Sequence, residues 1–278
     1  MLYYSKQYID DDDIQSVIDV LKSGAITQGN KLVEFEELLA RKVGVNYSLA
    51  VNSATSALHL ACISLGLEEG DYLWTSSISF VASANCGLYC KANIDFVDIH
   101  PRTGLMSITA LENKLKIAAL EKKLPKIVIP VHLAGSSCDM EAIKQLSKEY
   151  GFKIIEDASH AVGGRYKSKF VGSCEFSDIT VFSFHPVKII TTGEGGMLLT
   201  NNQYIFKKIN MLRGHGITYE ELELKSPGPW YYEQQLLGFN YRLTDIQAAL
   251  GISQLSRLEK IISKRNKIHN NYKKLLTK

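Results

Sequence analysis

The sequence lacks the features that mark membrane, secreted and nucleic-acid-binding proteins. No apolar run in its 278 residues approaches the roughly 18 residues that span a bilayer, and the N-terminus has neither the basic start nor the apolar core of a signal peptide. Basic residues outnumber acidic ones by only 32 to 29 and are scattered except near the C-terminus. We therefore expect a cytoplasmic protein with no membrane or nucleic-acid partner.

Cysteine is scarce and carries no disulfide or metal signature. The cysteines are odd in number, form no Cys-x-x-Cys motif and mostly lie among apolar or small residues. They are Cys62, Cys86, Cys90, Cys138 and Cys174. Cys86 and Cys90 are four residues apart on an expected helix, but the sequence nearby holds no histidine or second cysteine pair to complete a metal site. We expect reduced thiols and no bound metal.

The composition is that of an ordinary globular protein, with 45% hydrophobic and 22% charged residues, and the length fits one large domain or two smaller ones. Short apolar runs alternate with helical patterns. The runs are YSLAV, DYLWTS, IDFVDI, KIVIPVHL and FKIIED, followed by DITVFSF and GGMLLT with only a turn between these last two. Several runs are apolar at consecutive positions, which is typical of a mostly parallel sheet covered by helices on both faces. The predicted fold class is α/β.

Helices are expected over 14–21, 33–39, 55–65, 80–90, 109–120 and 139–150. The acidic run from Asp10 to Asp13 suits the positive end of the first helix, and Gly24 is its expected end. Thr109 with Glu112 has the spacing of a capping box at the fifth. A last helical pattern begins at Thr244 and extends to about residue 276.

The first candidate site is a strand that runs into a small, hydroxyl-rich turn, Val51 to Ser56. Small side chains let an anion approach the free backbone amides at the start of the following helix, and the hydroxyl groups add donors. The sequence predicts a phosphate site here, with an ordinary helix N-cap as the alternative.

The second candidate site is the end of the strand that contains Glu156 and Asp157. A buried carboxylate needs a partner, and a protonated heteroaromatic nitrogen is one candidate for Asp157. A helix cap or a salt bridge is the alternative. His160, three residues further on, is placed to contact a ring hydroxyl or to serve a structural role.

The third candidate site is Lys188, which follows a buried strand and precedes the Gly-rich turn Thr191 to Gly196. Desolvation there lowers the pKa of a lysine, as a Schiff-base amine requires, whereas a surface lysine is the alternative. Together, a phosphate cradle, a strand-end aspartate and this lysine match the needs of pyridoxal phosphate. Nicotinamide binding explains fewer of these features, because no G-x-G-x-x-G follows the first strand.

The sequence resembles the sugar-nucleotide aminotransferases of the DegT/DnrJ type, pyridoxal-phosphate enzymes with the aspartate aminotransferase fold (fold type I). The resemblance extends in order from about Tyr4 to about Gly251. Its motifs are SGAITQG, NSATSALHLA, SISFVASAN, EDASHAVGG, SFHPVKIITTGEGG, RGHG and NYRLTDIQAALG. It implies the large domain of that fold, with a mostly parallel mixed sheet.

The resemblance assigns roles to residues at matching positions. It makes Lys188 the Schiff-base lysine and Asp157 the partner of the pyridinium nitrogen, and these are the expected catalytic residues. The other expected cofactor-binding residues are Ala54, Thr55 and Ser183 at the phosphate, Phe80 against the ring face, His160 near the ring hydroxyl, and Asn240. Because Asn240 would reach the phosphate of the neighbouring subunit's cofactor, the resemblance also implies a homodimer with shared active sites.

Within the family, the residues from Tyr4 to Gln7, Gly24 to Thr27 and Ser159 to Ala161 look most like the transaminases of pseudaminic-acid synthesis. His160 stands where a glutamine is common elsewhere in the family. The expected substrate-binding residues are Tyr4, Gly24, Ala25, Ile26, Thr27, Ala54 and Ser183. The implied substrate is a UDP-linked 4-keto-6-deoxy N-acetylamino sugar, aminated at C4 with glutamate as donor.

The resemblance also predicts the domain organisation. It implies a cofactor-binding large domain over 1–243, with an N-terminal helical segment, and a long helix over 244–278 that leads to a small C-terminal domain missing from this chain. Two other functions are open alternatives. One is a truncated, inactive remnant or sensor that binds pyridoxal phosphate or pairs with an intact homologue. The other is a sugar dehydratase on the same fold, which Lys188 disfavours because those enzymes have a histidine in its place.

Overall fold

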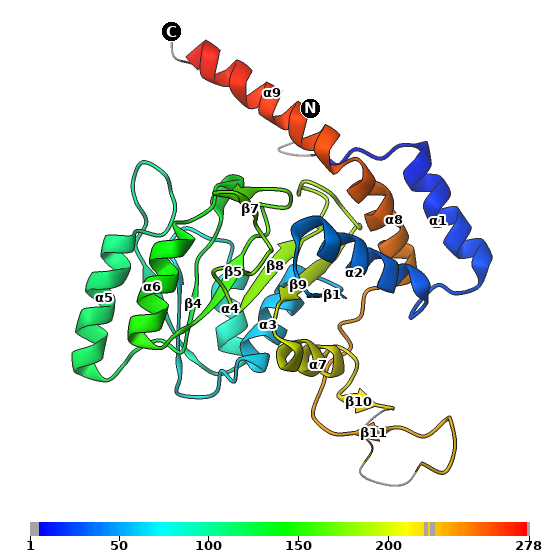
Figure 1. Ribbon diagram of the computed structural model, residues 1–278, viewed down its shortest axis with the longest axis horizontal. Helices are drawn as coiled ribbons and strands as arrows, with labels where there is room; N and C mark the ends of the chain where they lie inside the picture. The colour runs from blue at the N-terminus through cyan, green and yellow to red at the C-terminus, as the bar shows by residue number, and fades with distance from the viewer. Residues whose placement is uncertain (1–5, 220–221, 223–225, 277–278) are drawn as a thin grey trace.

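The computed structural model describes residues 6–219, 222 and 226–276. A seven-stranded sheet forms its centre, in the order β1-β9-β8-β5-β4-β2-β3 (Figure 1). These strands are β1 Tyr47–Val51, β2 Tyr72–Ser76, β3 Asn93–Val97, β4 Ile127–Ile129, β5 Lys153–Asp157, β8 Ile179–Ser183 and β9 Gly196–Thr200. Strand β9 is antiparallel to both of its neighbours, and the other strands all run in one direction. The carboxyl ends of those strands therefore meet at one edge of the sheet.

Helices cover both faces of this sheet, except that α1 packs on α8 and α9 projects outward (Figure 1). The helices are α1 Asp11–Ser23, α2 Asn30–Val43, α3 Ala54–Ser64, α4 Ala82–Tyr89, α5 Ile108–Glu121, α6 Met140–Tyr150, α7 Gln203–Leu212, α8 Asp245–Ser256 and α9 Leu258–Leu276. The small elements are the 3-10 turn η1 Leu133–Gly135 and the strand pairs β6 Arg165–Tyr166 with β7 Lys169–Phe170 and β10 Ile217–Thr218 with β11 Glu233–Gln234.

The core consists of three apolar clusters that follow from the continuous apolar strands. In β8, Ile179 and Val181 enter the cluster that packs under α3, α4 and α7, whereas Phe182 enters a cluster with α2 and α8 on the opposite face. A third cluster joins that opposite face to α5 and α6. Because alternate residues of a strand point to opposite faces, a strand that is buried on both faces carries apolar residues on both of them.

The ends of α1 follow the predicted chemistry. Asp10 caps the helix, and its side chain and that of Asp13 satisfy each other's backbone amides in a capping box. Gly24 ends the helix at φ 80°, a left-handed conformation that glycine adopts without a Cβ penalty.

Two local predictions are wrong. Helix α5 is capped by Ser107, whose hydroxyl accepts from the Ala110 amide at 3.2 Å, so Thr109 lies inside the first turn and forms no capping box with Glu112. The connection between β8 and β9 is not a simple turn, because it spans residues 184–195 and carries Lys188.

The last predicted helix is divided in two at Arg257. The guanidinium of Arg257 binds the carboxylates of Asp10 and Asp13, and this ion pair joins the start of α1 to the junction of α8 and α9. Thr244 caps α8, and its side chain and that of Gln247 satisfy each other's backbone amides. Helix α9 extends away from the body of the protein at its far end (Figure 1).

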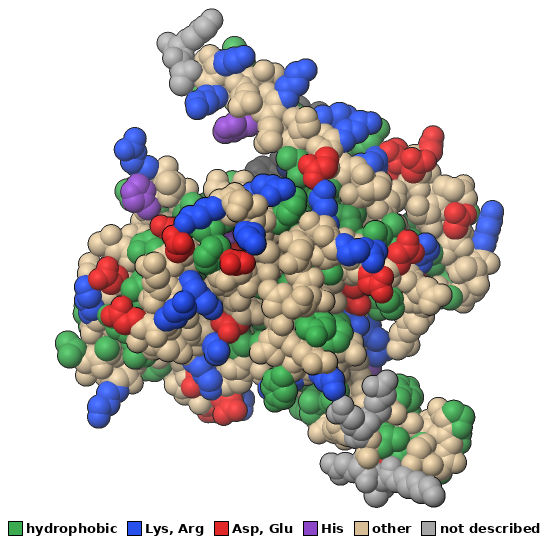
Figure 2. Space-filling model, in the orientation of Figure 1, with side chains coloured by type: hydrophobic (Ala, Val, Ile, Leu, Met, Phe, Trp, Pro, Cys, Tyr) green, Lys and Arg blue, Asp and Glu red, His purple; other side chains and the backbone are tan. Residues whose placement is uncertain are grey.

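Charged side chains of both signs are interspersed over the face drawn in Figure 2, and the charged side chains along α9 are mostly Lys and Arg. In the part of the chain that the structure describes, no helix combines the length and apolarity needed to cross a membrane.

Candidate active site

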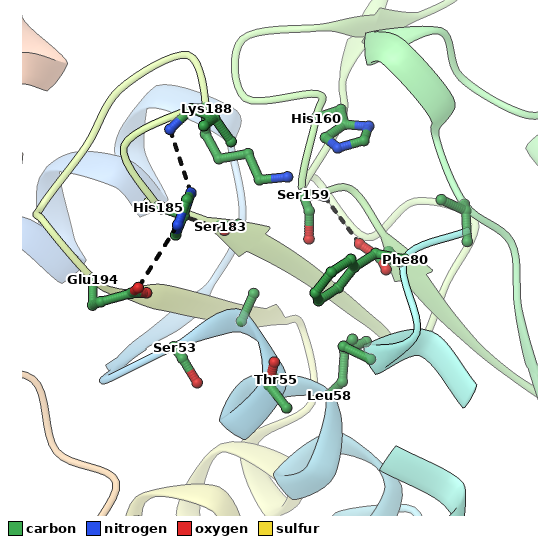
Figure 3. A pocket seen from close by; sticks show the side chains of 15 residues that line it. Ser53, Thr55, Leu58, Phe80, Ser159, His160, Ser183, His185, Lys188 and Glu194 are labelled. Atoms are coloured by element: carbon green, nitrogen blue, oxygen red, sulfur yellow. Dashed lines mark hydrogen bonds and ion pairs between the residues drawn. The ribbon is translucent and has the colours of Figure 1, made fainter. Parts of the chain in front are cut away.

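A cavity of about 450 Å³ lies at the edge where the parallel strands end. The structure brings seven of the predicted site residues together in its lining, and Figure 3 shows how Thr55, Phe80, His160, Ser183 and Lys188 lie around it. They are Ala54, Thr55, Phe80, Asp157, His160, Ser183 and Lys188. The side chain of Lys188 points across this cavity toward Ser159 and His160 (Figure 3).

The N-terminus of α3 forms one wall of the cavity. Ser53 caps the helix by accepting from the Ser56 amide at 3.1 Å, and the Ser53 carbonyl accepts from the amide of Ala57. The amides of Ala54 and Thr55 have no hydrogen-bond partner among the described residues. Two free amides at the positive end of a helix form a site for an anion such as phosphate.

Gly196 permits the close packing that builds this wall. In the sheet it is paired with Val51 of β1 and with Ser183 of β8, so it lies directly between two strand ends of the site. A Cβ atom at Gly196 would lie 2.6 Å from the Ala54 nitrogen and 2.6 Å from the Ser53 carbonyl carbon. Only glycine lets β9 begin this close to the start of α3.

Asp157 ends β5 inside the cavity and is only 4% exposed. Its two carboxylate oxygens have different donors. The Ser83 hydroxyl donates to Oδ2 at 2.6 Å, and the Ser159 amide donates to Oδ1 at 3.1 Å. The two donors satisfy both oxygens of this buried carboxylate and fix its orientation.

The neighbouring carboxylate, Glu156, is fully engaged elsewhere. It accepts from Ser177 at 2.5 Å and from Thr180 at 3.1 Å, and its other oxygen lies 2.7 Å from Nε2 of His132. Burial raises the pKa of Glu156, but the hydrogen bond and charge of His132 hold it below its ordinary value. Of the two carboxylates at this strand end, Asp157 is therefore the one that lines the cavity.

Lys188 lies in the loop after β8 and is half-buried. Its amide donates to the His185 carbonyl at 2.9 Å, and its carbonyl accepts from Arg265 of α9 at 3.2 Å. Burial lowers the pKa of its ammonium, and the charge of Asp157 offsets part of this effect. A lysine with a lowered pKa supplies the unprotonated amine that attacks a carbonyl group.

The backbone fixes the tautomer of His160. The Ala134 amide donates to Nδ1 at 3.2 Å, which assigns the proton of the neutral ring to Nε2. Burial and the positive charge of Lys188 lower the pKa of His160. His160 therefore offers the cavity a neutral N–H donor.

Phe80 contributes an apolar surface at the mouth of the cavity. Its side chain is 71% exposed even though it is a large aromatic ring. In Figure 3 the ring lies between Ser159 and Leu58 and faces the open space. An exposed ring beside a cavity is available to stack against a flat ligand.

The remaining predicted residues do not line this cavity. Gly24 to Thr27 form an exposed connection between α1 and α2, where the Ile26 carbonyl accepts from Asp245 at 3.1 Å. Asn240 is exposed, and its carbonyl lies 3.5 Å from the side-chain amide of Asn52 just before α3. Tyr4 lies outside the described residues.

Several residues of the site have no individual signal in the sequence. Ser83 lies in the motif SISFVASAN, but its contact with Asp157 joins positions 74 residues apart. His185 and Glu194 also line the cavity, with 3.8 Å between Nε2 and Oε1. Asp245 is buried and accepts from the Gly29 and Lys31 amides at 2.7 and 2.9 Å, which holds α8 against the start of α2.

The chemistry of the donors also bears on metal binding. Within the described ranges, no group of three or more His, Cys, Asp and Glu side chains is arranged to hold a metal ion. The five cysteines are free, and four of them are buried.

Comparison with known proteins identifies relatives over nearly the whole chain. The profile of the DegT/DnrJ/EryC1/StrS aminotransferase family matches residues 7–278. A UDP-4-amino-4,6-dideoxy-N-acetyl-beta-L-altrosamine transaminase of Campylobacter jejuni is 42% identical over 276 residues, which are 99% of this chain and 69% of the relative.

Solved structures agree with the predicted fold class. PseC of Helicobacter pylori, an aminotransferase involved in the biosynthesis of pseudoaminic acid, has a TM-score of 0.82 and 36% identity, covering 92% of this chain and 66% of its own. Spr1654 of Streptococcus pneumoniae in its PLP form has a TM-score of 0.86 and 31% identity, covering 98% and 71%. The predicted α/β fold class is confirmed, and the chain spans about two thirds of the length of these relatives.

Proposed function

From its membership of the DegT/DnrJ/EryC1/StrS aminotransferase family, to which this chain belongs, we propose that it transfers an amino group to the keto group of a nucleotide-linked sugar with pyridoxal phosphate as cofactor. One observation carries the proposal. The Lys188 amine, the Asp157 carboxylate and the free amides of α3 all face a single cavity of about 450 Å³.

The residues present fit each part of the cofactor. The amides of Ala54 and Thr55, with the Ser183 hydroxyl, would hold the phosphate at the N-terminus of α3. Gly196 supports this fit, because a side chain at this position would collide with the backbone of Ser53 and Ala54 at this N-terminus. Pyridoxal phosphate supplies an electron sink that stabilises negative charge on the substrate carbon attached to nitrogen.

The other side chains would bind and orient the ring. Phe80 would lie against one face, and the Nε2–H of His160 would donate to the ring hydroxyl. Asp157 would hold the protonated ring nitrogen, since its carboxylate is buried and already oriented by two donors. The lowered pKa of Lys188 suits its Nζ to attach the cofactor and then to accept and return a proton within the cavity.

We further propose that the acceptor is a UDP-linked 4-keto-6-deoxy N-acetylamino sugar, aminated at C4 with glutamate as donor. The support is the 42% identity to the Campylobacter jejuni altrosamine transaminase and the similarity to Helicobacter pylori PseC. Gly24 to Thr27 would contribute to the sugar-nucleotide site. Since these residues do not line the cavity of their own chain, this role requires the partner subunit or a movement of the segment.

A homodimer with shared sites is part of the proposal. Asn240 is exposed and lies outside the cavity of its own chain, so its amide is available to the phosphate site of a partner. The large domain of 1–243 would hold the cofactor, and the helical segment from Thr244 would lead away from it.

The direct test is amino transfer by the purified chain. The protein is incubated with pyridoxal phosphate, nitrogen-15 glutamate and the UDP-4-keto sugar, and the sugar product is analysed by mass spectrometry. The proposal predicts a labelled 4-amino sugar and an equal amount of 2-oxoglutarate, and no product from Lys188→Ala. Cofactor binding without any transfer would instead identify a binding remnant or sensor.

A further inference from the structure

We propose that Ser83 is a positioning residue that holds the charge and orientation of the Asp157 carboxylate toward the ring nitrogen of the cofactor. The inference rests on the proposed function, because it assigns Asp157 to that nitrogen. It assigns a role of its own to Ser83, which the proposed function uses only as one of the two donors to Asp157.

The direction of the Ser83 hydrogen bond follows from simple proton counting. The Ser83 Oγ lies 2.6 Å from Asp157 Oδ2 and 2.6 Å from the Ser79 Oγ. A carboxylate can only accept, so the single hydroxyl proton of Ser83 is committed to Asp157. Ser79 is then the donor toward Ser83, and the three groups form a relay that ends at the carboxylate. The single Ser79 proton is shared with a second acceptor, the Phe80 carbonyl at 3.0 Å.

The environment makes this bond strong. The Ser83 side chain is 0% exposed and Asp157 is 4% exposed, so the bond between them is shielded from bulk water. Hydrogen bonds to a charged group are about twice as strong as those between neutral groups. Together with the Ser159 amide on Oδ1, Ser83 fixes the rotation of the carboxylate and stabilises its charge.

The position of Ser83 also links two sides of the cofactor. Ser83 lies in the first turn of α4, and its amide donates to the carbonyl of Phe80 at 3.2 Å. One short segment therefore carries the ring that would face the cofactor and the hydroxyl that orients its nitrogen partner. A charged, fixed carboxylate favours a protonated ring nitrogen, whereas a free or neutral carboxyl does not.

The test compares two probes that differ only at the ring nitrogen. Pyridoxal phosphate and its 1-deaza analogue, which has a C–H in place of that nitrogen, are titrated into the wild-type chain, Ser83→Ala and Ser83→Thr. We expect Ser83→Ala to lower the affinity for pyridoxal phosphate on the order of tenfold and to leave the analogue unchanged. Ser83→Thr keeps the hydroxyl and should therefore bind pyridoxal phosphate more tightly than the analogue, as the wild-type chain does.

Ser76 provides a matched control. It is also a fully buried serine, at the end of β2, but its hydroxyl has no hydrogen-bond partner in the described part of the chain. Ser76→Ala should leave the ratio of the two affinities unchanged. In the Asp157→Asn background, Ser83→Ala should no longer change this ratio, because the charge that it supports is gone.

The outcomes separate the two claims. If the wild-type chain binds pyridoxal phosphate with a preference over the analogue but Ser83→Ala keeps that preference, the role of Ser83 is refuted and the proposed function stands. An equal loss of affinity for both probes in Ser83→Ala would show that Ser83 has a purely structural role, and it would also refute the proposal. Should Ser83→Ala fail to fold, Ser79→Ala removes only the outer donor of the relay and must lower the preference in the same direction. A wild-type chain that binds neither probe overturns the proposed function itself, and with it this inference.

Discussion

Burial lowers the pKa of the Lys188 ammonium, and the carboxylate of Asp157, which faces the same cavity, raises it by a smaller amount. The two residues come from different strand ends, β5 and the loop after β8. The net effect is an amine that loses its proton at a lower pH than an ordinary lysine does. The charge of Asp157 limits this lowering of the pKa. The protonation of Lys188 therefore depends on the carboxylate that would hold the ring nitrogen of the cofactor.

Removal of the Asp157 charge should lower the pKa of Lys188 further. In Asp157→Asn, burial remains and the opposing charge is lost. Trace acetylation of the cofactor-free protein across a pH series, analysed by mass spectrometry, measures the fraction of unprotonated amine at each lysine. The midpoint for Lys188 should move to lower pH in the variant.

Lys116 is the internal reference for that experiment. It is exposed, and its hydrogen bond and ion pair with Glu112 raise its pKa. Its midpoint should lie above that of Lys188 and should be the same in both proteins. A Lys188 midpoint that stays in place or rises in Asp157→Asn would show that the two residues do not interact in this way.

Gly196→Ala should disrupt the phosphate wall. The added Cβ would meet backbone atoms of Ser53 and Ala54 at 2.6 Å, and overpacking of this kind costs about 1–3 kcal/mol. We expect lower stability to urea and much weaker binding of pyridoxal phosphate. Gly214→Ala is the matched control, because the nearest atom to its Cβ would be 3.8 Å away. Equal behaviour of the two variants would argue against this wall as the phosphate site.

Arg213, from the motif RGHG, should be needed for stability. It forms a buried ion pair with Glu36 and donates to the Ala50 carbonyl at 2.8 Å, which joins α7, α2 and β1. Arg213→Ala leaves Glu36 buried without its partner and should lower the free energy of unfolding by about 3–5 kcal/mol at neutral pH. Urea denaturation measures the loss.

The pH dependence of that loss has a definite sign. Burial raises the pKa of Glu36 above its ordinary 4.5, and Arg213 counteracts this effect. A carboxyl whose pKa is raised in the folded state binds more protons there, so stability falls as pH rises from the unfolded to the folded pKa. Without Arg213 the pKa of Glu36 in the folded state rises further, so the pH range over which stability falls becomes wider. The loss of unfolding free energy in Arg213→Ala should therefore be smallest near pH 4. A loss that is constant with pH would contradict the pairing.

Shared active sites predict complementation between two inactive chains. Lys188→Ala removes the attachment point and Asn240→Ala removes the group expected to reach the partner's phosphate. Mixed dimers should regain one intact site each, seen as half of the wild-type cofactor content. Mixtures that bind no more cofactor than either parent would show that each chain forms its own site.

The sequence indicates the strand ends of the site because the signal there is local. Asp157 follows an apolar run and Lys188 precedes a glycine-rich turn, and both features can be recognised within a few neighbouring residues. The positions of these strand ends at one edge follow from a parallel sheet, which the consecutive apolar residues predict. For this reason seven predicted residues line one cavity.

The parts that could not be predicted depend on contacts distant in sequence. The division of the last helix at Arg257 depends on carboxylates at Asp10 and Asp13, more than 240 positions away. The role of Gly196 depends on how closely β9 approaches α3, and that distance has no signal in the sequence. The prediction for α5 failed because Ser107 and Thr109 are both competent caps two residues apart, and the helix begins after Ser107.

The most direct test of the account is the site of cofactor attachment. Purified protein is mixed with pyridoxal phosphate, reduced with borohydride and digested, and the labelled peptide is identified by mass spectrometry. The account predicts one label per chain, on Lys188, and none in Lys188→Ala. A label on a different lysine, or no label on wild-type protein shown by circular dichroism to be folded, would contradict it.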